Sequence, residues 1–131
     1  MKEKIIINRE LNSSSAAIIW NLISTDVGMS RWLADAVTQD GETITFLWGE
    51  VWRHHEIRKA TIVSKSCQKH IRLVWEDEDD DEAYVEIQME RSTITNDYVL
   101  TITDFAYPDE VESLRAIWQE NFTRLRQTSG V

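Results

Sequence analysis

The segment 108–127 constrains the fold most, because it predicts a long helix with a single apolar face. Its apolar side chains recur at helical spacing, and Asp109 with Glu112 predicts a capping box at its start. Twenty residues at about 1.5 Å each give a helix about 30 Å long, the width of a small domain. Such a helix needs a broad apolar surface to cover its face. The face consists of Val111, Leu114, Ile117, Trp118, Phe122 and Leu125.

Most of the remaining chain has the patterns of strands. Residues 2–11 predict a first strand, and serine- and threonine-rich caps then introduce two short helices over 16–23 and 27–33. Asp40-Gly41 predicts a hairpin turn, and Tyr107-Pro108 leads into the long helix. The other predicted strands are 36–39, 42–48, 51–63, 69–75, 83–90 and 98–105, with a bulge expected inside 51–63.

This order of elements predicts an α+β fold. A curved antiparallel sheet of about six to seven strands would wrap around the long C-terminal α-helix, with two short helices after the first strand. The 131 residues show no internal linker or repeat. We therefore expect a single domain over 1–131, large enough to bury its own core.

Composition excludes several classes of partner. The formal net charge of -9 opposes binding to nucleic acid and to anionic membranes, which both attract Lys and Arg. No apolar run approaches the roughly 18 residues of a membrane span, and residues 1–20 lack the pattern of a signal peptide. The single Cys67 allows no internal disulfide and fits a reducing compartment. These features predict a cytoplasmic protein.

Three stretches resemble the START-like superfamily of helix-grip domains. Trp20 lies in SSSAAIIWNLIST where the family favours a helix Trp, and Trp32 ends the second short helix in GMSRWLAD. The last helix carries VESLRAIWQENFTRLRQ, with an apolar residue, a Trp and a final Leu at the family's spacing. The resemblance covers essentially the whole chain. It is strongest to the branch that contains homologues of the heat-shock chaperone ATPase activator.

The resemblance implies a cavity between the concave face of the sheet and the long helix. Members of the superfamily hold lipids, sterols, polyketides or other apolar molecules there, so the leading hypothesis is a non-catalytic domain that binds a small apolar or amphipathic ligand without cofactor or metal. Because the chain is short for this fold, its own Trp and Phe side chains could make the cavity small or fill it. The expected lining consists of Leu114, Ile117, Trp118, Asn121, Phe122 and Leu125, faced by Ile71, Leu73, Val85 and Ile87.

Two alternatives from other classes follow from the same resemblance. Some members bind chaperones, so the chain could be a protein-interaction module whose acidic surface steers it toward a basic partner. A few members are cyclases, aromatases or hydratases. An enzyme of that kind would need a His or a carboxylate in the cavity as general base, and the candidate histidines are His54, His55 and His70. The oligomeric state is left open.

Three smaller features have both a functional and a purely structural interpretation. The acidic run 76–82, EDEDDDE, lacks the spacing of a calcium loop and predicts a solvated hairpin loop. Cys67 and His70 have the spacing of a zinc half-site, but no second pair accompanies them. Asn121 falls inside the apolar arc of the long helix, where its amide needs a partner. That partner is either a structural hydrogen bond or a ligand in the cavity.

Overall fold

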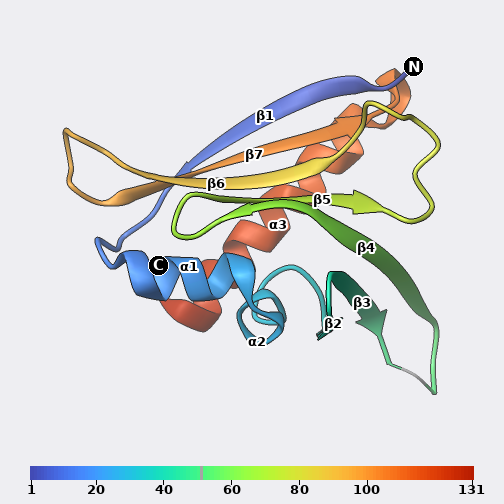
Figure 1. Ribbon diagram of the computed structural model, residues 1–131, viewed down its shortest axis with the longest axis horizontal. Coiled ribbons are helices and arrows are strands. Elements are labelled where there is room, and N and C mark those ends of the chain that lie inside the picture. Colours follow the sequence, from blue (N-terminus) through green and yellow to red (C-terminus); the bar gives the residue numbers. More distant parts are fainter. Residues whose placement is uncertain (51) are drawn as a thin grey trace.

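The computed structural model describes residues 1–50 and 52–131. A seven-stranded antiparallel sheet, in the order β1-β7-β6-β5-β4-β3-β2, curves around the C-terminal helix (Figure 1). This is the α+β arrangement that the sequence predicts. The elements are β1 (Glu3–Glu10), α1 (Ala16–Ser24), α2 (Asp26–Met29), β2 (Ala36–Asp40), β3 (Thr43–Gly49), β4 (His55–Ser66), β5 (His70–Trp75), β6 (Val85–Arg91), β7 (Tyr98–Ala106), η1 (Pro108–Glu110) and α3 (Val111–Ser129).

Alternating apolar residues give the sheet one covered face. In β6, Val85, Ile87 and Met89 are buried, as period-two alternation predicts. Gly41 takes a φ of 62° in the turn between β2 and β3, a conformation that favours glycine. The strand β4 has a bulge between Ile62 and Ser64, at the end of the predicted range 51–63 rather than in its middle. The predicted start of this strand at Val51 lies outside the described residues.

The two short helices follow β1 and are capped as expected. The side chain of Ser15 accepts a hydrogen bond from the backbone of Ile18, and Thr25 does the same for Gly28. The second helix ends at Met29 rather than at residue 33. The chain turns there so that Trp32 enters the core, where it is fully buried. Its indole Nε1 donates to the backbone oxygen of Leu22 at 2.9 Å.

The long helix α3 begins later than the sequence predicts. Asp109 does not cap it, because Pro108–Glu110 forms a separate turn of 3-10 helix, and α3 starts without a side-chain cap. Gly130 ends the helix at a φ of 76°. In the described part of the chain, no helix is long and apolar enough to cross a membrane.

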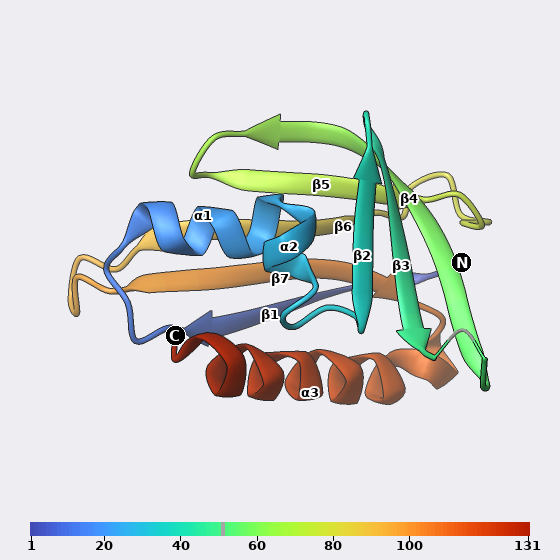
Figure 2. The same cartoon turned by 90° about the horizontal axis from the view of Figure 1, so that it is seen from below.

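The placement of α3 determines where the fold leaves space. The helix contacts β1 and β7 at one edge of the sheet. Figure 2 shows it running alongside β1, while β2 and β3 run at a steep angle to the other strands. The helices α1 and α2 lie over the same face, and Trp32 stacks on Phe122 of α3 with a centroid separation of 5.9 Å. One end of the concave face is therefore filled by core residues.

Candidate ligand-binding site

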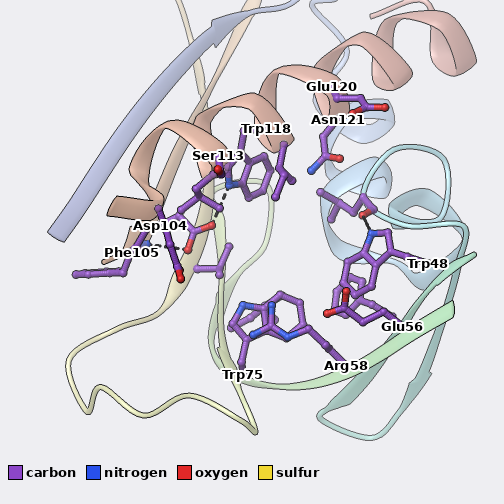
Figure 3. Close-up of a pocket in the computed structure, with 18 of the residues that line it drawn as sticks. Trp48, Glu56, Arg58, Trp75, Asp104, Phe105, Ser113, Trp118, Glu120 and Asn121 are labelled. Carbon is purple, nitrogen blue, oxygen red and sulfur yellow. Dashed lines mark hydrogen bonds between the residues drawn. The ribbon is translucent and has the colours of Figure 1, made fainter. Parts of the chain in front are cut away.

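A cavity of about 1040 Å³ lies between α3 and the concave face of the sheet. The aromatic side chains expected to fill it form part of its wall instead (Figure 3). The expectation of a small or filled cavity is therefore wrong. Its volume is at the upper end of the roughly 300–1,000 Å³ of typical small-molecule sites.

An aromatic cluster forms the wall on the strands β3 and β5. Phe46 stacks on Trp48 with ring centroids 5.9 Å apart and meets the edge of Trp75 at 5.3 Å. The indole Nε1 of Trp48 donates to the backbone oxygen of Leu33 at 3.0 Å, which fixes the ring. The guanidinium of Arg58 lies over Trp75, 4.0 Å from its centroid. The wall is thus a rigid apolar surface with one cationic edge.

Asp104 is the acidic group buried in the cavity wall. It follows Leu100 and Ile102 on the inward face of β7, and its exposed fraction is only 9%. Its Oδ2 accepts a hydrogen bond from the indole Nε1 of Trp118 at 2.9 Å, and its Oδ1 accepts from the backbone N–H of Phe105 at 2.8 Å. Figure 3 shows the Asp104–Trp118 pair on the opposite side of the cavity from Trp48 and Trp75.

Burial raises the pKa of Asp104 to about 6, and the hydrogen bonds from Trp118 and Phe105 only partly oppose this effect. A carboxyl group with this pKa gains or loses its proton close to neutral pH. It can accept a hydrogen bond or a proton from a molecule bound in the cavity. Sequence reasoning missed this residue, although its position on the apolar half of an alternating strand was a readable signal.

The structure brings most of the expected lining residues to the cavity. Of the long-helix residues, Phe122 and Leu125 belong to the core beneath it, as does Ile71 on the sheet. Ile117 lines the cavity with an exposed fraction of 55%, so it lies at the edge rather than in the core. The expected residues at the wall are Leu114, Ile117, Trp118, Asn121, Leu73, Val85 and Ile87.

Asn121 is half-buried in the cavity wall. Within the described part of the chain, its side chain makes no hydrogen bond. Figure 3 shows the amide directed into the open space between α3 and the aromatic cluster. The structure therefore gives no support to a structural hydrogen bond and places the amide where a ligand could meet it.

The three histidines lie away from the cavity. His54 and His55 are exposed, and a ring nitrogen of His55 lies 2.8 Å from the backbone oxygen of Arg53. His70 is half-buried and its Nε2 lies 2.8 Å from the hydroxyl of Ser64. None of the three histidines lines the cavity, so the enzyme hypothesis loses the support that they would have given it. Cys67 is exposed, and among the described residues no group of side chains has the arrangement of a metal site.

The acidic run 76–82 lies in the hairpin loop between β5 and β6 and is mostly exposed, as the sequence predicts, but several of its carboxylates have partners. The Lys2 ammonium lies 2.6 Å from Glu78 Oε2, and Tyr107 donates to Asp79 at 2.8 Å. Asp80 accepts from the backbone N–H groups of Lys2 and Glu82. The hydrogen bond from Tyr107 holds the pKa of Asp79 below its usual range. Several of these carboxylates therefore anchor the loop to the start of β1 and the end of β7.

Comparison with known proteins agrees with this architecture. The family model of the START-like superfamily domain matches residues 1–131. A Bacteroides fragilis protein solved by solution NMR is 41% identical, with 97% of this chain and 90% of that chain covered and a TM-score of 0.64. No curated protein matches the sequence.

Two further solved structures share the fold at low identity. The Aha1 dimer from Colwellia psychrerythraea is 16% identical, covers 98% of both chains and has a TM-score of 0.74. The AHSA1-like protein from Aeromonas hydrophila is 15% identical, covers 98% of this chain and 94% of that one, and has a TM-score of 0.72. These Aha1-like neighbours agree with the branch of the superfamily that the sequence resembles most. With the family model matching over its whole length, the chain belongs to the START-like superfamily.

Proposed function

We propose that this protein binds a small amphipathic molecule in the cavity between α3 and the sheet, and holds it without chemical change. The observation that carries the proposal is the cavity itself, whose 1040 Å³ are bounded by aromatic rings and a few inward polar groups. Ligand sites are characteristically apolar pockets with a small number of placed polar groups that orient the ligand. We further propose that the protein works in the cytoplasm, where the exposed thiol of Cys67 would stay reduced.

Two features of the wall support binding of a molecule with an apolar body and a polar end. The cluster of Phe46, Trp48 and Trp75 supplies rigid apolar area. Asp104 and Asn121 supply polar groups on the opposite wall. A purely apolar ligand would leave the Asn121 amide without a partner and the remaining acceptor sites of the Asp104 carboxylate unfilled in a dry site, which is unfavourable.

A cavity-filling substitution tests the proposal. Asn121→Trp should project an indole into the cavity from α3 without altering the core residues, and Gln119→Trp adds the same side chain at an exposed position of the same helix. Thermal-shift screening and native mass spectrometry of gently purified protein should reveal binders for the parent and for Gln119→Trp. Binding should be lost in Asn121→Trp. The proposal fails if no compound binds the parent, or if both variants bind alike.

A protein-interaction module is the second candidate. Trp52 follows β3 with an exposed fraction of 80%, and Ile57 on β4 is 52% exposed. Exposed Trp is enriched in protein interfaces, and the net charge of -9 would favour a partner with a basic surface. Pull-downs with Trp52→Ser at low and high salt test this candidate. If no partner is retained even at low salt, the candidate fails.

A further inference from the structure

We propose that the cavity selects ligands that carry a single cationic amine-type group, and that Asp104 is the residue that binds this group. The inference rests on the proposed ligand-binding function and adds the chemical class of the ligand. Three observations support it. The cationic side chains around the cavity already have partners, the Asp104 carboxylate has unused hydrogen-bond acceptor sites, and an aromatic wall lies opposite it.

The Asp104 carboxylate is held in place and has unused acceptor capacity. A carboxylate offers about four lone-pair sites, and the bonds from Trp118 and from the backbone of Phe105 use two of them. Among the described residues, no Lys, Arg or His forms a direct ion pair with Asp104; Arg58 and Lys2 lower its pKa only through space, and less than burial raises it. A nearly buried carboxylate without a cationic partner is stabilised most by a cation brought in with the ligand.

The cationic side chains of the cavity wall already have carboxylate partners. Arg58 donates two hydrogen bonds to Asp77, at 3.1 and 2.8 Å. The ammonium of Lys2 lies 2.6 Å from Glu78. An anionic ligand would have to compete with these carboxylates for its partner.

The third cation of the wall is also engaged. Arg124 donates to the backbone oxygen of Ala34 at 3.0 Å and lies 3.6 Å from Asp35. The lining as a whole has six carboxylates against three cations, Lys2, Arg58 and Arg124. Clefts lined by an excess of one charge concentrate ligands of the opposite charge. The carboxylates are Asp35, Glu56, Glu78, Asp104, Glu110 and Glu120.

The aromatic wall indicates which chemical group the ligand carries besides its cationic amine. Figure 3 shows Trp48 and Trp75 across the open space from Asp104. A ligand whose amine contacts Asp104 would therefore extend its apolar body toward these rings. Trp118 lies next to Asp104, to which its indole donates a hydrogen bond, and its ring can add a cation–π contact with the bound amine. The class that fits is an aromatic or alkyl amine with one charged end.

Three probes with the same ring distinguish the charge preference from general apolar binding. Naphthylmethylammonium, naphthylmethanol and naphthoate should be titrated into the parent protein by isothermal calorimetry at about pH 7.5. We expect the ammonium to bind about tenfold or more tightly than the alcohol, and naphthoate to bind most weakly, because a desolvated carboxylate discriminates by charge. Equal binding of the three, or preference for naphthoate, overturns the inference while leaving the proposed function intact.

Variants then assign the preference to one residue. Asp104→Asn keeps an oxygen acceptor and removes the charge, so it should lose the preference for the ammonium while keeping the affinity for the alcohol. Glu112→Gln removes one charge from an exposed position of α3 outside the cavity wall and should retain the preference. An equal loss in both variants would assign the effect to diffuse charge and overturn the role of Asp104. If Asp104→Asn does not fold, the ranking of the probes on the parent decides. If none of the probes binds the parent, both the inference and the proposed function fail.

Discussion

Replacement of Asp104 by Asn should raise the stability of the protein relative to the parent as the pH rises toward neutral and above. Burial raises the pKa of this carboxyl from 3.8 to about 6, a difference of about two pKa units. Each unit corresponds to about 1.4 kcal/mol, so ionised Asp104 destabilises the folded state by about 3 kcal/mol relative to its protonated form. That is a large fraction of the ~5–15 kcal/mol that stabilises a typical domain.

The direction of the pH dependence follows from the raised pKa. Below about pH 4 the group is protonated in both folded and unfolded chains and has no charge to bury. As the pH rises through about 6 the folded chain must ionise it, so the stability that this group contributes at low pH is lost. The amide introduced by Asp104→Asn would carry no charge at any pH, and its single oxygen can still accept from Trp118. The bond from the backbone N–H of Phe105 loses its acceptor, but this loss is the same at every pH. The difference between variant and parent should therefore grow in favour of the variant as the pH rises.

Urea denaturation of both proteins at several pH values between about 4 and 8 measures this difference. Other carboxylates titrate in the same range, but they are common to both proteins and cancel in the comparison. We expect the variant to gain about 2–3 kcal/mol over the parent between the ends of the range. A difference that stays constant with pH would show that Asp104 is not held in a desolvated site, and the reasoning would be refuted.

Three further substitutions test the packing and the contacts. Trp118→Ala should cost about 3–5 kcal/mol by urea denaturation, because it leaves a large void and removes a hydrogen bond to Asp104; a variant that unfolds like the parent would contradict the placement of α3. Asn121→Leu should keep or raise the melting temperature while weakening ligand binding, since its amide makes no bond within the described chain; a lower melting temperature would indicate a structural partner. Glu78→Gln should cost about 1–2 kcal/mol, because its charge-assisted bond to Lys2 is mostly buried, and an unchanged denaturation midpoint would mean that the loop is not anchored there.

The fold followed from the sequence because its signals are local and consistent with one another. The helical arc with Trp118 and Phe122 fixes one long amphipathic helix, and Asp40-Gly41 fixes a tight turn between two strands. The errors fall at helix ends. Asp109 has the chemistry of a cap, but Pro108 starts a separate 3-10 turn that takes up this residue. Local patterns identify elements better than their first and last residues.

The site was less predictable because it depends on which residues meet across the fold. Helical spacing correctly placed Leu114 and Asn121 on the face of α3 that points to the sheet. Whether a residue on this face lines the cavity or lies in the core depends on how far the sheet curves away from α3. Phe122 and Leu125 share that face and lie in the core because Trp32 packs into the space beside Phe122. No local pattern encodes this contact.

Asp104 connects the stability of this protein to its proposed function. A buried carboxylate without a cationic partner weakens the fold, whereas an asparagine at the same position would avoid the charge and still accept a bond from Trp118. Where a chain keeps a destabilising polar group, function is the usual reason, because stability and activity often compete at a site. The two effects of Asp104→Asn therefore belong together. Higher stability with loss of amine binding would identify Asp104 as a ligand anchor. Higher stability with unchanged binding would leave the carboxylate without a function in the cavity.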